Sequence, residues 1–230
     1  MIVEEMQTYY GKRAPEYDAS MGYDDPEKTA LLRPVISEIK SILRGCTVLE
    51  IACGPCFWTE QIAGCVKSIK ATDYNPATLV EAAQKQLPWE KVTLEQADAY
   101  RVNEIAGDFD SIFAVDWFAH VPLERMADFM KQLIDRVPAG SPIIFVDQTP
   151  GPKSLTDAFD QNGNHIQTRS IANGTSFRVV KHFFTDQQLT EIFDPFDGDL
   201  SINRFPECRR LVVTFTKSSS LGFSSLGSYA

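Results

Sequence analysis

Apolar residues recur along the chain in two alternating patterns, which predict a layered sheet covered by helices. Short apolar runs are typical of buried parallel strands, and apolar residues three or four positions apart are typical of helices that pack on a sheet. The expected strands are 47–51, 68–72, 92–95, 109–115, 143–147, 200–205 and 210–217. The expected helices are 26–43, 59–63, 76–86, 123–137 and one that starts near 185. This alternation predicts an α/β fold with a doubly wound, mostly parallel, seven-stranded sheet.

The alternation is interrupted between residues 149 and 183. Residues 149–163 are rich in Pro, Gly and Asp, which is typical of a loop. Two extended runs, 166–171 and 176–183, then flank Asn173-Gly174, a strong signal for a β-hairpin. We expect this hairpin near the mouth of a binding site, with Arg169 as a substrate contact and its other charges in solvent.

The strand at 47–51 leads into a turn of small residues. Glu50 lies at the end of the strand, and Ala52, Cys53 and Gly54 follow it. Small residues permit a sharp turn and a close approach of a ligand to the backbone. The G-x-G-x-x-G pattern of dinucleotide sites is absent, and Pro55 has no amide proton to offer a pyrophosphate. The turn and its acid therefore suit a ligand that is cationic or neutral at this point.

The stretch Glu50-Ile51-Ala52-Cys53-Gly54-Pro55-Cys56 resembles the first motif of the class I S-adenosylmethionine-dependent methyltransferases. That motif is an acid followed by small residues, E/D-x-G-x-G-x-G, and Ala52 and Cys56 occupy two of its glycine places. The resemblance implies a Rossmann-like sheet with an antiparallel last strand and S-adenosyl-L-methionine as the cofactor. It implies cofactor contacts at Glu50, Ala52, Cys53 and Gly54.

Two further acids follow the next strands. Asp73 lies about twenty residues beyond the turn, where nucleotide-binding sheets place an acid that accepts from both ribose hydroxyls. Tyr74 and Asn75 are expected beside it; alternatively, Asp73 or Asn75 only caps the helix that begins at Pro76. By the same resemblance, Asp98 and Ala99 are expected to contact the adenine; the alternative is an ordinary polar loop.

The segment after the fourth strand is expected to face the transferred methyl group, because ligands bind beyond the carboxyl ends of such strands. It reads Asp116-Trp117-Phe118-Ala119-His120. Asp116 is a predicted cofactor contact, and Trp117 and Phe118 are predicted substrate contacts. His120 is the candidate catalytic base that would titrate near neutral pH. The alternative for His120 is a structural role at the start of the next helix.

The N-terminal arm places Tyr9, Arg13 and Tyr17 four residues apart, on one face if the arm is helical. It resembles the arm that folds over the cofactor in one group of small-molecule methyltransferases. We expect residues 1–22 to form a helical lid, with Arg13 on the cofactor's carboxylate and Tyr10 on the substrate; the alternative is a solvated arm packed on the domain. Residues 23–217 are expected to form one domain, and the Ser/Gly-rich residues 218–230 a disordered tail.

The composition of the chain limits which binding partners and which cellular location we expect. The net charge of −9 argues against a nucleic-acid partner. The chain has no apolar run of membrane-spanning length and no signal peptide, and its five cysteines are unevenly spaced, so we expect reduced thiols and a cytoplasmic protein. Cys53 and Cys56 have C-x-x-C spacing but no second ligand pair, so no metal is expected. We expect a monomer or a homodimer.

Together these features predict an S-adenosylmethionine-dependent methyltransferase that moves a methyl group to an oxygen or nitrogen of a small molecule. One alternative is a nicotinamide-dependent oxidoreductase on a related sheet, which the missing glycines disfavour. The other is a protein of the same fold that binds the cofactor without catalysis.

Overall fold

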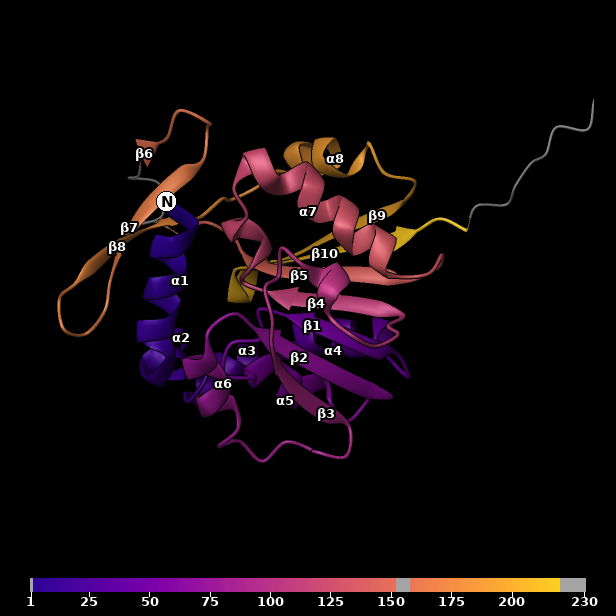
Figure 1. Cartoon of the computed structure of the whole chain (residues 1–230), viewed down its shortest axis with the longest axis horizontal. Coiled ribbons are helices and arrows are strands. Elements are labelled where there is room, and N and C mark those ends of the chain that lie inside the picture. The colour runs from indigo at the N-terminus through magenta and orange to yellow at the C-terminus, as the bar shows by residue number, and fades with distance from the viewer. Residues whose placement is uncertain (1, 152–157, 220–230) are drawn as a thin grey trace, which may run out of the picture.

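The computed structural model describes residues 2–151 and 158–219, and its centre is one seven-stranded sheet (Figure 1). The strand order is β3-β2-β1-β4-β5-β10-β9. The strands are β1 Thr47–Ile51, β2 Ser68–Asp73, β3 Val92–Gln96, β4 Ser111–Val115, β5 Pro142–Gln148, β9 Gly198–Phe205 and β10 Arg210–Lys217. β1 to β5 pair in parallel, and β10 runs antiparallel to both of its neighbours, β5 and β9. The predicted doubly wound sheet with an antiparallel last strand is confirmed.

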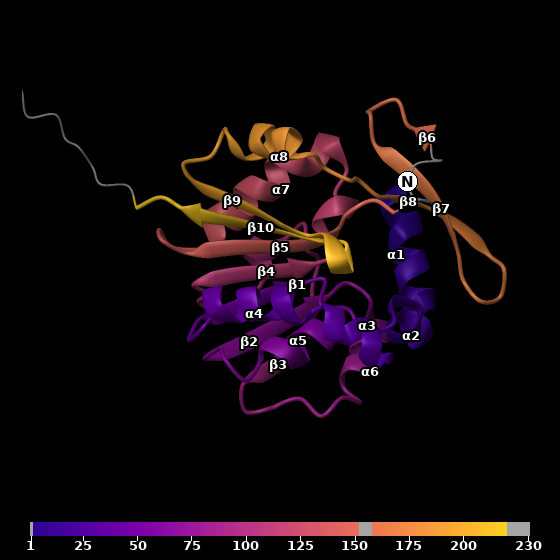
Figure 2. The ribbon, with the colours of Figure 1, turned by 180° about the vertical axis from the view of Figure 1, so that it is seen from behind.

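Helices cover both faces of this sheet (Figures 1 and 2). One apolar cluster joins the sheet to the helices of one face, α4 Arg33–Ile42, α5 Phe57–Ile62 and α6 Pro76–Ala82, and another joins it to those of the other face, α7 Leu123–Arg136 and α8 Asp186–Phe193. Val48 of β1 belongs to the first cluster and Leu49 to the second, because successive side chains of a strand point to opposite faces. α8 begins with the predicted capping box of Thr185 and Gln188.

The helix expected at 26–43 is two helices, α3 Pro26–Leu31 and α4. Pro34 explains the break. It lacks an amide proton, and in a continuous helix its ring would clash with the carbonyl four residues earlier. The proline instead occupies the first turn of α4, where a missing amide proton leaves no bond unmade.

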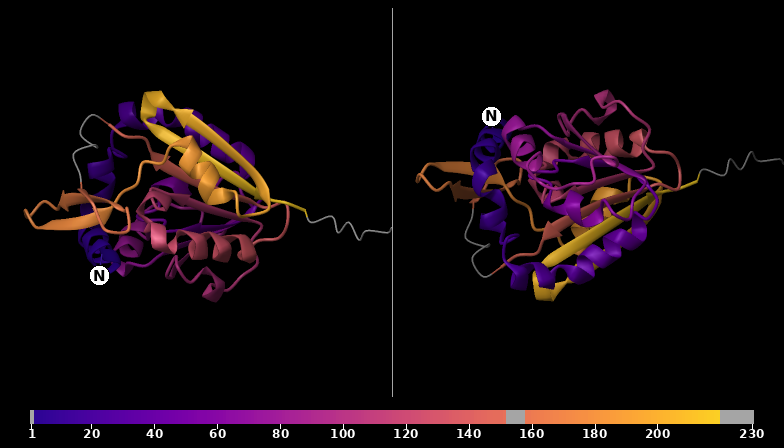
Figure 3. Two further views of the ribbon diagram at one scale, coloured as in Figure 1. Left: turned by 90° about the horizontal axis from the view of Figure 1, so that it is seen from above. Right: turned by 90° about the horizontal axis from the view of Figure 1, so that it is seen from below.

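The N-terminal arm and the inserted segment pack on each other. The arm contains α1 Ile2–Arg13, a 3₁₀ turn at Ala14–Glu16 and α2 Tyr17–Met21. The insert contains the predicted hairpin, β7 His165–Ser170 and β8 Ser176–Val180, and a further short strand, β6 Ala158–Phe159. α1 lies along β8, and Figure 3 shows this small sheet projecting from one end of the molecule beside α1.

Specific contacts join α1 to β8. The Tyr9 and Phe177 rings lie 5.8 Å apart, and Glu5 forms a 3.0 Å ion pair with Arg178. None of the helices in the described ranges has the length and apolarity that crossing a bilayer requires. The predicted disordered tail falls almost wholly on residues 220–230, and part of the predicted loop on residues 152–157, both outside the described residues.

Candidate active site

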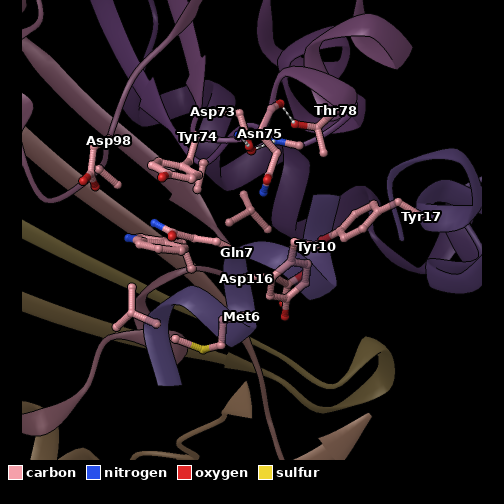
Figure 4. Close-up of a pocket in the computed structure, with 16 residues that line it drawn as sticks. Met6, Gln7, Tyr10, Tyr17, Asp73, Tyr74, Asn75, Thr78, Asp98 and Asp116 are labelled. Carbon is pink, nitrogen blue, oxygen red and sulfur yellow. Dashed lines mark hydrogen bonds between the residues drawn. The ribbon is translucent and has the colours of Figure 1, made fainter. Parts of the chain in front are cut away.

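A cavity of about 730 Å³ lies at the carboxyl ends of β1, β2 and β4, beneath α1 (Figure 4). Its lining includes nine of the predicted cofactor contacts: Tyr17, Ala52, Gly54, Asp73, Tyr74, Asn75, Asp98, Ala99 and Asp116. These residues come from segments far apart in the sequence. The sheet brings them together because parallel strands end at one edge. We call this space the cofactor cavity.

The turn after β1 forms the floor of the cofactor cavity. Ala52, Gly54 and Cys56 all have left-handed backbone, with φ of 51°, 55° and 63°. Ala52 and Cys56 occupy places where the resembling motif has glycine, the residue that adopts this conformation without strain. A non-glycine residue there costs about 1–2 kcal/mol. The turn therefore keeps the motif's backbone shape at some cost in stability.

Glu50 and Cys53 lie behind this turn, in a smaller adjoining cavity. The Glu50 carboxyl is buried and accepts a 2.7 Å hydrogen bond from the Thr59 hydroxyl. Burial raises the pKa of Glu50 to about 8, so the group is protonated at neutral pH. The predicted direct contacts of Glu50 and Cys53 with the cofactor are not supported, because both residues line the smaller cavity and neither is among the described residues that line the cofactor cavity.

Asp73 connects the ends of β1 and β2. One carboxylate oxygen accepts from the Gly54 amide at 3.0 Å, and the other accepts from the Asn75 amide at 2.8 Å. Asn75 occupies the cap position of α6, but within the described residues its side chain makes no capping hydrogen bond. Asp73 thus holds the turn in place while its carboxylate, which still has lone pairs to share, borders the cavity where ribose hydroxyls can bind.

Asp98, Ala99 and Trp117 line the cofactor cavity on the β3 and β4 side. Asp98 accepts from the Tyr100 amide at 2.9 Å. Trp117, a predicted substrate contact, lies in this cavity, with its ring 5.6 Å from that of Tyr100. An acid beside aromatic surface is suited to an adenine base.

Phe118 is a wrong prediction. Its ring is 2 % exposed and stacks on Phe145 at 4.4 Å, in the apolar cluster beneath α7 and α8. The 3₁₀ turn Phe118–His120 rotates consecutive side chains apart, so Phe118 packs in the core while Trp117 lines the cofactor cavity and His120 lines the second cavity described below.

α1 provides the roof of the cofactor cavity. Val3, Met6, Gln7 and Tyr10 recur at helical spacing and form one face that lines it. Figure 4 shows Met6, Gln7 and Tyr10 on the side of the cavity opposite Asp73 and Asn75. Sequence reasoning used the Tyr9, Arg13 and Tyr17 spacing and missed this face, although its period is visible in the sequence.

A second cavity, of about 610 Å³, meets the first at Tyr10, Tyr17 and Asp116. We call it the acceptor cavity. Four further residues that were predicted for the site line it, namely Tyr9, Arg13, His120 and Arg169. Gln148 and Lys181, which were not predicted, line it as well. Arg13 lies over the Tyr17 ring at 4.9 Å and donates to the Ser20 hydroxyl at 2.7 Å. Tyr9, Arg13 and Tyr17 do come together, although α1 ends at Arg13 and a 3₁₀ turn separates it from Tyr17.

His120 lies in the acceptor cavity, but both of its ring nitrogens are engaged. Nδ1 donates to the Val180 carbonyl, so Nε2 is the acceptor for the Tyr10 hydroxyl at 2.8 Å. Burial, reinforced by the nearby Lys181, lowers the pKa of His120 to about 3. The expectation that His120 titrates near neutral pH is wrong for this arrangement, because a buried imidazole between a phenol and a carbonyl stays neutral.

Lys181 is the main functional candidate that sequence reasoning missed. It follows β8 and was expected in solvent, yet its side chain is 3 % exposed and lies 3.6 Å from Asp147 at the end of β5. Burial raises the pKa of Asp147 to about 6, although Lys181 opposes the shift. The sequence carries no local signal for this burial, because it depends on the insert folding back over the sheet. No group of three metal-ligating side chains is found among the described residues.

The sheet order, the left-handed turn after β1 and the cavity at the strand ends define the fold and site of a class I methyltransferase. A family model described as a methyltransferase domain matches residues 48–140. A comparison with curated proteins found no match. The fold, the site and these similarities are consistent with the class I S-adenosylmethionine-dependent methyltransferase family, and the cofactor is S-adenosylmethionine.

Solved structures agree along nearly the whole chain. A DhpI–SAH complex is 28% identical, with a TM-score of 0.74, and the match covers 94% of this chain and 97% of that one. A DhpI–SAM–HEP complex is 28% identical, with a TM-score of 0.76 and coverage of 93% and 97%. An S-adenosylmethionine-dependent methyltransferase from Clostridium acetobutylicum is 16% identical and shares the fold, with a TM-score of 0.62 and coverage of 91% and 99%.

Proposed function

We propose that this methyltransferase transfers the methyl group to an oxygen of a small molecule that carries an acidic group. The observation that carries the proposal is the buried Lys181 in the acceptor cavity. A buried ammonium is costly unless a negative charge faces it, and Asp147 is 3.6 Å away with a raised pKa. An anionic substrate would supply a stronger partner.

The charges around the acceptor cavity are unbalanced. Arg13, Arg169 and Lys181 line it. Among the described residues its lining has one carboxylate, Asp116, which is already paired with Arg210 at 2.7 Å. Arg13 and Arg169 make their hydrogen bonds to the neutral side chains of Ser20 and Gln167. This excess of cations favours an acid over an amine, which would be repelled in its protonated form.

An ionised acid oxygen also suits the rest of the site. S-adenosylmethionine supplies an electrophilic methyl group on a sulfonium. The nucleophile carries no proton to remove, so no side chain has to act as a base. The neutral Tyr10–His120 pair can orient the acceptor by hydrogen bonding, the cations can hold its charge, and α1 excludes water from above. Among the similar proteins, DhpI has been solved in a complex with both SAM and HEP. That complex supports a site in which a second small molecule binds together with the cofactor.

The test is a panel of small carboxylic and phosphoryl acids, alcohols and amines, assayed with labelled S-adenosylmethionine. We expect turnover on acids. We also expect Lys181→Met to lower kcat/KM for the best acid by about 10–100-fold, because the variant loses one charge-assisted hydrogen bond to the substrate. Cofactor affinity should change much less than kcat/KM, because Lys181 acts on the cofactor site only through its effect on the charge of Asp116. Lys131→Met is the matched control, since Lys131 is exposed on α7 and pairs there with Asp135.

Amines or alcohols as the only substrates would contradict the proposal, as would an unchanged kcat/KM in Lys181→Met. Cofactor binding without turnover on any substrate would favour the non-catalytic alternative.

A further inference from the structure

Arg210 is a buried cation that neither cavity accounts for. It is the first residue of β10, and its side chain is 6 % exposed. Its Nη1 donates to an oxygen of Asp116 at 2.7 Å. Within the described residues it lines neither the cofactor cavity nor the acceptor cavity, and its hydrogen bond to Asp116 connects it to both of them.

Arg210 is held from its other side by two aromatic residues. Its Nη2 donates to the Tyr23 hydroxyl at 3.2 Å, and the Trp58 indole N–H donates to the same oxygen at 2.9 Å. The guanidinium lies 5.8 Å from the Trp58 ring, and Tyr23 stacks on Phe57 at 3.8 Å. A planar guanidinium fixed by a hydroxyl and an aromatic ring has little freedom to rotate, so it defines the orientation of its carboxylate partner.

Asp116 occupies the junction of the two cavities and is under strain there. It has left-handed backbone, with φ of 52°, and it lines both cavities. Arg210 takes one of its oxygens. The other oxygen, Oδ2, is buried and has no hydrogen-bond partner among the described residues. An ionised carboxylate with a buried, unpaired oxygen is costly, which indicates that a ligand supplies the missing donor.

The chemistry of the cofactor identifies that donor. The sulfonium group has no N–H or O–H to donate, and the methionine carboxylate would be repelled. The ammonium group of the methionine portion has three N–H donors and a positive charge. Arg210 keeps Asp116 ionised for it, since burial alone would raise the pKa of Asp116 and Arg210, with help from Lys181, lowers it instead.

We propose that Arg210 is a positioning residue, which holds Asp116 so that its free oxygen receives the ammonium group of S-adenosylmethionine. The last strand of the sheet thereby takes part in cofactor binding without touching the cofactor. This inference rests on the cofactor and not on the identity of the acceptor, so it stands or falls separately from the acidic acceptor proposed above.

The test measures the affinity of the enzyme for S-adenosylmethionine and for S-adenosylhomocysteine by calorimetry between pH 5.5 and 8. Asp116→Asn should weaken both ligands by about 10–100-fold, because both carry the ammonium group. Arg210→Met should weaken both most strongly at low pH, relative to wild type, and the deficit should shrink as pH rises and the unpaired carboxyl ionises. Arg210→Lys, which keeps the charge, should show no such pH-dependent deficit.

Other charged and titratable groups face Asp116 and also affect how cofactor affinity depends on pH. They come from the N-terminal arm, the 3₁₀ turn, β5 and the end of β8, and they are Tyr10, Tyr17, Tyr23, His120, Asp147 and Lys181. All of them are retained in the Arg210 variants. Because Arg210 also lowers the pKa of Asp147, the pH dependence of the Arg210→Met deficit is compared with that in the Asp116→Asn background, where only the contribution of Asp147 remains.

Two comparisons make the inference falsifiable. In an Asp116→Asn background, Arg210→Met should cause no further loss of affinity; an equal further loss would show that Arg210 is only structural. A loss confined to S-adenosylmethionine would point to the sulfonium and overturn the ammonium assignment, as would unchanged affinity in Asp116→Asn. If Arg210→Met does not fold, the inference is tested with two other variants. These are the double variant, in which both buried charges are removed, and Arg210→Lys.

Arg204→Met is the control, because Arg204 lies on the neighbouring β9 in a surface pair with Asp186.

Discussion

At the scale of single residues, the site depends on neutral hydrogen-bonding groups as much as on charges. The Tyr10 hydroxyl and His120 form a pair whose direction is fixed by the Val180 carbonyl on the far nitrogen. Burial raises the pKa of Tyr10 and lowers that of His120, so both stay uncharged across the physiological range. The pair is therefore suited to orienting an acceptor.

We expect His120→Ala and Tyr10→Phe to lower kcat/KM for the acceptor by similar amounts, about three- to tenfold, which is the value of one neutral hydrogen bond. The double variant should lose little more than either single variant, because the two groups act together. The pH profile near neutrality should be the same in His120→Ala as in wild type, since the pKa of His120 is about 3. A neutral-pH limb that disappears in His120→Ala would instead identify His120 as a base.

At the scale of elements, α1 and the inserted sheet act as a cover for the cavities. α1 lines the cofactor cavity with one face and packs on β8 with another. The apolar cluster between them, which contains Met6, Tyr9, Phe177 and Val179, is separate from the two clusters of the main sheet. A small separate cluster opens at a lower free-energy cost than a domain core. We propose that the arm is a lid, which lifts to admit the cofactor.

The lid proposal predicts that S-adenosylhomocysteine slows tryptic cleavage after Lys12 and Arg13, because a ligand held beneath α1 stabilises its closed position. Cleavage rates should be measured by mass spectrometry over time with and without the ligand. Cleavage after the exposed Arg44, between α4 and β1, is the internal control. Equal protection at both places would indicate global stabilisation, and no protection at either would contradict a lid.

At the scale of the whole molecule, the fold limits which cofactor binds. The turn after β1 has no amide proton at Pro55, and it lacks the G-x-G-x-x-G pattern. These features disfavour the pyrophosphate of a dinucleotide and are compatible with S-adenosylmethionine.

We expect S-adenosylhomocysteine at 100 times its Kd to stabilise the protein by about 2.7 kcal/mol and to raise Tm by roughly 5–11 °C, and NAD to cause no shift. A thermal unfolding series with both ligands checks this. Asp73→Ala should abolish most of the shift at the same ligand concentration, because its carboxylate borders the cavity and holds the Gly54 amide. A shift with NAD would reopen the oxidoreductase alternative.

The sequence by itself determined the order of the strands and helices, the turn after β1 and most residues of the cofactor cavity. These follow from local rules. Side chains alternate along a strand, small residues permit a left-handed turn, and the ends of parallel strands meet at one edge. Asp73 and Asp116 could be assigned to one cavity because each lies at the carboxyl end of a strand of that edge, and Asp98, just beyond β3, was assigned to it by the family resemblance.

Only the tertiary structure decided which charged groups are buried and where they point. Lys181 becomes a buried cation because the insert folds back over the end of β5, and Arg210 becomes one because β10 inserts between β5 and β9. Glu50 and Phe118 line neither the cofactor cavity nor the acceptor cavity, although the nearby Ala52 and Trp117 line the cofactor cavity. Burial of a charge depends on elements that lie many residues apart, and the pKa of His120, Asp147 and Glu50 depends on that burial. No local pattern in the sequence predicts which charged groups become buried.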